Sequence, residues 1–203
     1  MPSKDITCCG RGRPREFDID EVLCDAMKVF QTRGYAGTSL VDLIEGTGLT
    51  RGSLYKAFKD KRTLFLAALD RYTTAGMDNL RANLATGSPR DAIRKTLIQI
   101  ACASAHKMGR RGCLVVASAT EMASKDEQIR QRISRTFSRM QSLLEDAVRR
   151  GQATGEIQSR RDPEALARFL LCAIEGMGVL GKTGRTEEEM SAIVDVALEA
   201  FKW

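Results

Sequence analysis

Apolar residues recur every three or four positions along almost the whole chain, and no stretch alternates apolar with polar residues as a β-strand does. This periodicity predicts an all-α fold with about nine helices. Serine, threonine and aspartate residues that can cap a helix N-terminus mark where the helical patterns begin. The expected caps are Asp18, Thr38, Thr50, Asp60, Ser88, Ser124, Asp162 and Thr186, and a shorter helix is expected over residues 112–123.

Residues 16–62 contain the first three of these helices, and the second and third are short. Glycines at 46 and 48 lie between these two helices. Because glycine tolerates the backbone angles of a tight turn, we expect the chain to turn there. Leu54 and Phe58 give the third helix an apolar face, which leaves polar residues on its other surfaces. Two short amphipathic helices joined by such a turn, with a longer helix packed across them, predict a helix-turn-helix domain. The longer helices of residues 63–203 predict a separate antiparallel helical bundle.

The chain of 203 residues carries a formal net charge of +6, and its basic residues are concentrated in two segments. Counting Lys and Arg against Asp and Glu, the net charge is +3 over residues 1–15, +4 over residues 49–62, and −5 over the residues 16–48 between them. A basic tail and a basic third helix in one short region suit a surface that binds nucleic-acid phosphates. The alternative is that these charges only form solvated surface.

Specific residues in the stretch from Gly34 to Leu64 point the same way. The stretch contains the pairs Gly34-Tyr35 and Thr38-Ser39, the run Gly48-Leu49-Thr50-Arg51-Gly52-Ser53-Leu54-Tyr55, and then Phe58 and Asp60-Lys61. With these residues it resembles the DNA-binding domain of TetR-family transcriptional regulators. The remaining two thirds of the chain resemble that family mainly in the number and order of helices. The resemblance implies that the second domain binds an effector and forms a homodimer.

The expected DNA contacts lie in and around the third helix. The N-terminal residues of a recognition helix lie nearest the base edges, and an arginine such as Arg51 can donate two hydrogen bonds to a guanine, worth ~1–3 kcal/mol of discrimination. The resemblance implies that Thr38, Tyr55 and Lys61 bind phosphates. The full set of expected DNA-contacting residues is Thr38, Thr50, Arg51, Gly52, Ser53, Tyr55, Lys56, Lys59 and Lys61.

The basic segment over residues 1–15 is expected to be a flexible arm. Its residues Arg11, Arg13 and Arg15 resemble the extensions with which other DNA-binding proteins reach into a neighbouring minor groove. The alternative is a disordered tail that keeps the protein in solution.

A symmetric dimer that holds two recognition helices about 34–36 Å apart would meet successive major grooves of a palindromic operator. The apolar faces of the last two long helices are expected to form the dimer interface, although each residue on them could instead belong to the core of its own bundle. The expected interface residues are Leu166, Phe169, Leu170, Ala173, Met177, Ile193, Ala197 and Phe201. We therefore expect a repressor that binds double-stranded operator DNA. A small molecule, an electrophile or an oxidant is expected to release it from the DNA.

Cys113 follows Gly112 directly before the shorter helix. The N-terminus of a helix favours a thiolate, and Lys182 is expected to approach the thiol as a further positive group. Cys113 with Lys182 is therefore a candidate redox or electrophile sensor. The alternative is that Cys113 is a small apolar residue of the core.

Other chemistry is not expected. Cys8 and Cys9 are adjacent rather than spaced for chelation, and the single histidine, His106, is distant in sequence, so we expect neither a metal site nor a cofactor. Cys102 and Cys172 fall on apolar helical faces and are expected in the core. No glycine-rich phosphate loop or nucleophile with a base indicates an enzyme, and a helical scaffold that binds another protein is the alternative function. No apolar run approaches the ~20 residues of a membrane span, and the scattered cysteines favour the reducing cytoplasm.

Overall fold

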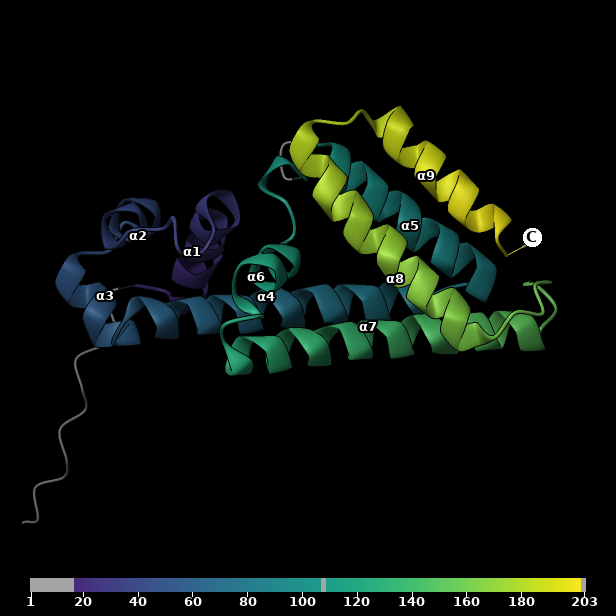
Figure 1. The fold of residues 1–203 in the computed structure, drawn as a ribbon, viewed down its shortest axis with the longest axis horizontal. Helices are drawn as coiled ribbons and strands as arrows, with labels where there is room; N and C mark the ends of the chain where they lie inside the picture. Colours follow the sequence, from purple (N-terminus) through teal and green to yellow (C-terminus); the bar gives the residue numbers. More distant parts are fainter. Residues whose placement is uncertain (1–16, 107–108, 202–203) are drawn as a thin grey trace, which may run out of the picture.

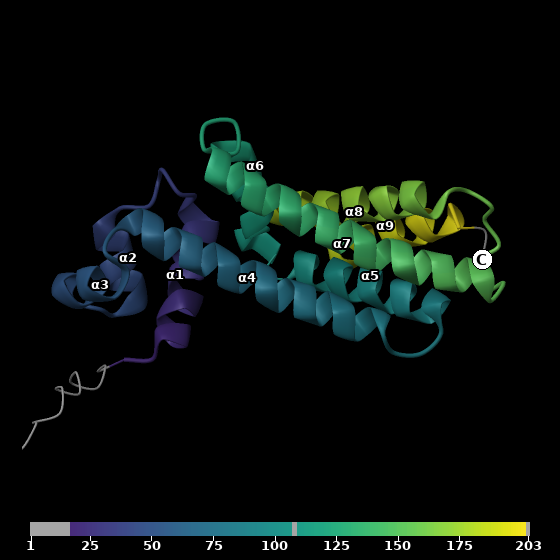
Figure 2. The ribbon, with the colours of Figure 1, turned by 90° about the horizontal axis from the view of Figure 1, so that it is seen from below.

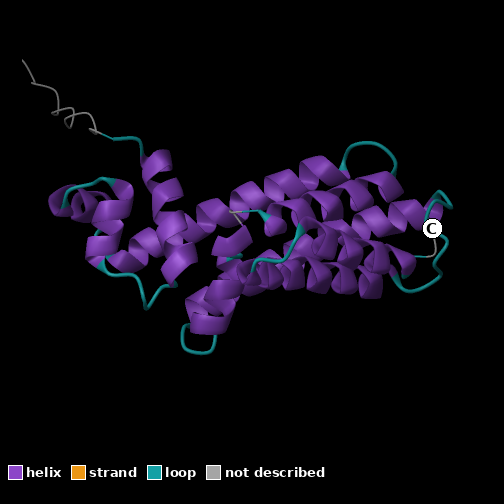
Figure 3. Cartoon of the chain, turned by 90° about the horizontal axis from the view of Figure 1, so that it is seen from above, coloured by secondary structure: helices purple, strands orange, loops and turns teal. Residues whose placement is uncertain are grey.

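The computed structural model describes residues 17–106 and 109–201. Within these residues it contains nine α-helices and no strand (Figure 3), so the predicted all-α fold is confirmed. The helices are α1 (Ile19–Arg33), α2 (Leu40–Thr47), α3 (Arg51–Phe58), α4 (Lys61–Leu84), α5 (Pro89–Ala105), α6 (Leu114–Met122), α7 (Glu127–Ala153), α8 (Pro163–Leu180) and α9 (Glu187–Glu199). The short 3-10 turn η1 (Gly109–Arg111) precedes α6, and a second one, η2 (Gly181–Thr183), follows α8. None of the described helices is both long and apolar enough to cross a membrane.

Most of the expected N-cap residues do cap the N-terminus of a helix. Side-chain oxygens accept backbone N–H groups at six of the eight expected caps, Asp18, Thr50, Asp60, Ser88, Asp162 and Thr186. The other two expectations were wrong by one or two residues. Ser39 caps α2, because the Thr38 hydroxyl donates to the Gly34 carbonyl instead. Asp126 rather than Ser124 caps α7, because the chain first completes a turn in which the Asp126 N–H donates to the Met122 carbonyl.

The buried apolar residues form two separate cores. The first joins α1, α2, α3 and the first half of α4 to α6 and the start of α7, and Phe30 and Phe65 meet in it edge to face with ring centroids 5.0 Å apart. The second joins the rest of α4 and α7 to α5, α8 and α9. Each large apolar side chain that leaves water for such a core contributes roughly 1.5–3 kcal/mol. The helix-turn-helix therefore shares its core with α6 and not only with its own three helices.

The long helices α4 and α7 belong to both cores and connect them (Figures 1 and 2). They run in the same direction: Arg132 pairs with Asp70 at 3.0 Å, and Arg150 donates to the Leu84 carbonyl at 2.9 Å near the other end. In Figure 1, α1, α2 and α3 gather at the left end of this pair, and α5, α8 and α9 cover its right half. A shift of α4 along α7 would therefore move one end of the molecule relative to the other.

The structure corrects the expected dimer interface. Five of its eight residues lie in the core of their own chain, namely Leu166, Leu170, Met177, Ala197 and Phe201. An amphipathic helix shows the same apolar stripe whether its neighbour is in the same chain or in a partner, so the sequence pattern could not separate the two. Of the other three, Phe169 is 43% exposed and Ala173 and Ile193 are half-buried. Cys172, expected in the core, is exposed, whereas Cys102 is half-buried.

Candidate nucleic-acid interface

Apolar residues on one side of the short helix α3 pack into the protein, and the polar residues on its other side face solvent. Gly48 ends α2 with a left-handed φ of +68°, a conformation that suits glycine, and so turns the chain into α3. Leu54 and Phe58 are buried beneath α3. The expected contact residues on the opposite side are exposed, namely Thr50, Arg51, Gly52, Tyr55, Lys56 and Lys59. The face that sequence patterning assigned to DNA is therefore open.

The first turn of α3 holds its side chains in a defined arrangement. The Thr50 hydroxyl accepts the Ser53 N–H at 3.2 Å and donates to the Ser53 hydroxyl at 3.0 Å. The guanidinium carbon of Arg51 lies 5.8 Å from the centre of the Tyr55 ring, within reach of a cation–π contact. A Cβ atom at Gly52 would meet no other atom within 4 Å. The turn thus combines a cation, two hydroxyls and an unobstructed backbone, which suits close approach to the edge of a base.

Two of the expected phosphate contacts take part in the turn that precedes α2. Thr38 is 1% exposed, and its hydroxyl donates to the Gly34 carbonyl at 2.6 Å, so its side chain cannot reach a phosphate. The ammonium of Lys61 donates to the Thr38 carbonyl at 2.6 Å and lies 4.5 Å from the Tyr35 ring centre. An ammonium has three N–H donors, so this bond leaves donors of Lys61 for a phosphate. The burial of Thr38 and its bond to Gly34 thus argue against the phosphate contact that the resemblance implies for its side chain.

The basic arm is not placed by the structure. Arg11, Arg13 and Arg15 lie outside the described residues, as do Cys8 and Cys9. The expected role of the arm in a minor groove therefore stays a prediction.

A carboxylate from α6 holds the turn between α1 and α2. Glu121 accepts the Tyr35 N–H at 2.8 Å on one oxygen and the Ala36 N–H at 2.5 Å on the other. A Cβ atom at Gly34 would lie 2.8 Å from the same carboxylate, and the φ of Gly34 is +72°. The backbone angle favours glycine there, and a side chain at this position would also displace the Glu121 carboxylate. No local signal in the sequence points to this role, because the two N–H groups lie 86 and 85 positions away from Glu121.

Two more contacts join the helix-turn-helix to the rest of the chain. Arg62, in the first turn of α4, pairs with Asp126 at 2.8 Å and donates to Gln128 at 2.9 Å. The hydrogen bond from Arg62 lowers the pKa of Asp126, so this pair stays charged at neutral pH. The Gln31 amide donates to the Gly112 carbonyl at 3.0 Å, directly before α6. The helix-turn-helix is therefore attached at the start of α6, at its end and at the start of α7.

The surroundings of Cys113 differ from those of a sensor thiolate. The Lys182 side chain does pack against Gly112, because a Cβ there would lie 2.1 Å from its Cε. Burial, and then the carboxylate of Glu175, nevertheless raises the pKa of the Cys113 thiol to about 11. Burial also raises the pKa of Glu175 and of Tyr72 beside it. Burial thus opposes the thiolate that the helix N-terminus is expected to favour, and the sensor role of Cys113 with Lys182 stays a prediction.

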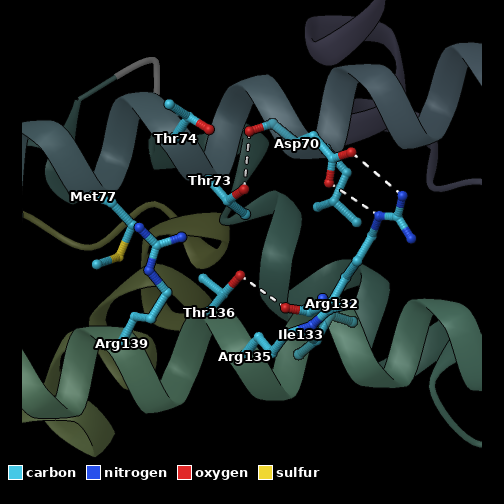
Figure 4. Close-up of a pocket in the computed structure, with 10 residues that line it drawn as sticks. Asp70, Thr73, Thr74, Met77, Arg132, Ile133, Arg135, Thr136 and Arg139 are labelled. Carbon is cyan, nitrogen blue, oxygen red and sulfur yellow. Dashed lines mark hydrogen bonds and ion pairs between the residues drawn. The ribbon is translucent and has the colours of Figure 1, made fainter.

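An open cleft of about 320 Å³ lies along α4 and α7, where the first core ends at Leu69 and Ile133 (Figure 4). Leu69, Met77 and Ile133 are buried and form its apolar part. Arginines of α7 line the other part, and one of them pairs with Asp70 across the cleft. The polar lining residues are Asp70, Thr73, Thr74, Arg132, Arg135, Thr136 and Arg139. An apolar floor beneath several guanidinium groups suits a small amphipathic anion.

Comparison with known proteins bears directly on this arrangement. A family model described as "Bacterial regulatory proteins, tetR family" matches residues 22–68, and one described as "Tetracyclin repressor-like, C-terminal domain" matches residues 90–197. The HTH-type transcriptional repressor ComR of Escherichia coli (strain K12) is 33% identical over 202 residues, 97% of this chain and 96% of ComR. The HTH-type transcriptional regulator YezE of Bacillus subtilis (strain 168) is 34% identical over 199 residues, 94% of this chain and 99% of YezE.

A solved structure extends the similarity to a protein on DNA. It contains a cysteine mutant of the TetR family transcriptional regulator CifR in complex with 26-bp double-strand operator DNA. It matches this chain with a TM-score of 0.82 and 34% identity, and covers 93% of this chain and 100% of the CifR chain. The similarity therefore includes both the helix-turn-helix and the bundle.

The raised thiol pKa predicts how Cys113 reacts. Because only about 10⁻⁴ of a thiol with a pKa of about 11 is ionised at pH 7, Cys113 should be alkylated by iodoacetamide far more slowly than free glutathione in the same tube. Its rate should rise with pH up to at least about pH 10. Mass spectrometry of the Cys113 peptide measures this rate, and a plateau between pH 7 and 8 would contradict the placement of the thiol.

Proposed function

This chain belongs to the TetR family of bacterial transcriptional regulators and is a DNA-binding regulator; from that premise we propose that it is a repressor, bound to a palindromic operator as a homodimer and released by an anionic small molecule. The exposed N-terminal turn of α3 carries the DNA-binding part of the proposal. It stands at the end of the molecule away from α5, α8 and α9 (Figure 1), where a duplex can approach it. The cytoplasm, where operator DNA is present, is the compartment this function requires.

Arg51 is the residue that we assign to base reading. Its planar guanidinium can donate two hydrogen bonds to the O6 and N7 atoms of a guanine, and Gly52 beside it lets the backbone come near the base edge. Tyr55 and Lys61 are assigned to phosphates, while the exposed Lys56 and Lys59 add charge. Phosphate contacts fix the register of the protein on the duplex, and base contacts select the sequence.

The exposed apolar residues of α8 and α9 are our proposed interface with a second copy of this chain. Phe169 and Val179 on α8 are 43% and 49% exposed, and Val196 on α9 is 65% exposed. Phe169 is kept from the expected set, and Val179, Val196 and the exposed Cys172 replace the five buried residues as our interface residues. Exposed apolar side chains on adjacent helices favour a protein interaction surface, and a two-fold pairing of such faces presents two α3 helices to one palindrome.

The cleft between α4 and α7 is our proposed effector site. An anion that enters it competes with Asp70 for the guanidinium of Arg132, while its apolar body covers Met77 and Ile133 (Figure 4). Since α4 carries the helix-turn-helix at its start, a ligand that moves α4 relative to α7 changes the separation of the two recognition helices. Release then requires that the effector bind the arrangement with the changed helix separation more tightly than it binds the DNA-bound arrangement.

The role of α3 can be tested with a duplex selected from a random library by the parent protein. Replacing Arg51 with alanine should cost ~1–3 kcal/mol of binding free energy and relax the preference at one base pair, because the bidentate contact to guanine is lost. Lys56→Ala should instead weaken binding to all sequences and reduce the salt slope by about 1.

Fluorescence anisotropy titrations over a series of salt concentrations measure both effects. Arg130→Gln, an arginine in the first turn of α7 that pairs with Glu127, is the matched control and should bind as the parent does. Unchanged affinity and base preference in Arg51→Ala would exclude this assignment.

The cleft is tested with 1-anilinonaphthalene-8-sulfonate, which joins an apolar body to one anionic group and fluoresces on binding. We expect one site per chain. Arg132→Gln and Arg139→Gln should each weaken binding about tenfold, as the loss of a hydrogen bond to a charged group does. Arg130→Gln should leave the affinity unchanged, and equal affinity in all three variants would rule out the cleft as the binding site.

A further inference from the structure

Three side chains with metal-binding atoms meet far from α3 and outside the α4–α7 cleft. Cys102 and His106 lie at the end of α5, and Glu187 is the first residue of α9. The helices α5 and α9 lie side by side in opposite directions, so the end of one meets the start of the other (Figure 1). One ligand atom from each residue lies within 4.8 Å of the other two.

The three ligand atoms lie close enough together for one ion to reach them all. Residues four positions apart share one face of a helix, so Cys102 and His106 lie on the same side of α5. A sulfur and a nitrogen bound to one tetrahedral zinc ion lie about 3.6 Å apart, which is closer than the 4.8 Å within which the three ligand atoms lie here. His106 and Glu187 are exposed and Cys102 is half-buried, so their side chains have room to close this difference by rotation.

The histidine ring is held as metal-binding histidines commonly are. The His106 Nδ1 lies 2.7 Å from the Cys102 carbonyl oxygen, and it donates there because a carbonyl oxygen only accepts. In a metal site the second ring N–H often donates to a backbone carbonyl in this way, and the bond fixes which nitrogen carries the lone pair. Nε2 is then the nitrogen that is left for an ion.

The three groups also select a class of ion. A thiolate and an imidazole favour zinc and similar transition metals over magnesium or calcium, which prefer oxygen ligands. The thiolate and the carboxylate together supply the two negative charges that neutralise a divalent cation. Three protein ligands leave a fourth tetrahedral position for water.

We propose that Cys102, His106 and Glu187 bind one zinc-type divalent ion per chain, with water as the fourth ligand. The ion links the end of α5 to the start of α9. It therefore stabilises the corner of the bundle from which the chain continues through η1 to α6. This site is separate from the proposed DNA surface and from the proposed effector cleft.

Zinc affinity measured on the full chain tests the proposal without DNA or effector. The parent for this test carries Cys8→Ser and Cys9→Ser, so that these thiols bind no metal, and it is kept reduced with a phosphine. Competition with a chromophoric chelator should give one Zn²⁺ per chain. Cys102→Ser and His106→Gln should each weaken binding by at least about tenfold, whereas the control Cys172→Ser should bind as the parent does.

Cobalt reports the ligands directly. With Co²⁺ the parent should show a thiolate-to-cobalt charge-transfer band, which Cys102→Ser abolishes and Cys172→Ser retains. Glu187→Gln changes an exposed side chain and leaves the packing intact. This variant should bind zinc more weakly and show a smaller zinc-induced rise in unfolding temperature. Because its fold is kept, these changes report the loss of a ligand and not a loss of fold. Parent affinity in Cys102→Ser, His106→Gln and Glu187→Gln, or a cobalt spectrum without the thiolate band, would overturn the proposal.

Discussion

Two backbone N–H groups, those of Tyr35 and Ala36, follow the end of α1 and are both accepted by one carboxylate, Glu121 on α6. Hydrogen bonds to a charged acceptor contribute roughly 1.5–3 kcal/mol each where they are shielded from water, and less where they are exposed as at Ala36. A side chain at Gly34 would displace this carboxylate. This contact fixes the turn from which α2 starts, and the position of α3 depends on that turn.

The consequences reach from the bundle to the DNA surface. Within the same turn the Thr38 hydroxyl donates to Gly34 and the Lys61 ammonium to Thr38, so the starts of α2 and α4 are tied together on either side of α3. The salt bridge between Arg62 and Asp126 then joins α4 to α7 at 2.8 Å. Since α6 shares the first core with the helix-turn-helix, a displacement of α6 or α7 is transmitted to α3 through packing as well as through these bonds.

Local chemistry made much of the fold predictable. Periodicity and capping residues depend on neighbours in sequence, so the helices and most of their starts could be predicted, and Leu54 and Phe58 identified the exposed side of α3. Contacts between distant segments could not be. The bond from Glu121 to Tyr35 joins residues 86 positions apart, and Glu187 meets Cys102 only after α9 packs on α5. The burial of Leu170 and Phe201 likewise depends on which helix covers each apolar stripe.

The affinity of Glu121→Ala for the selected operator duplex tests most directly whether α6 positions the recognition helix. All residues of α3 remain in this variant, so we expect binding roughly tenfold weaker, within the usual range of coupling free energies between sites. The salt slope should stay that of the parent, because the phosphate-binding residues are unchanged. Thr120→Ala, the exposed neighbour on α6, should bind as the parent does. Parent affinity in Glu121→Ala would contradict the account.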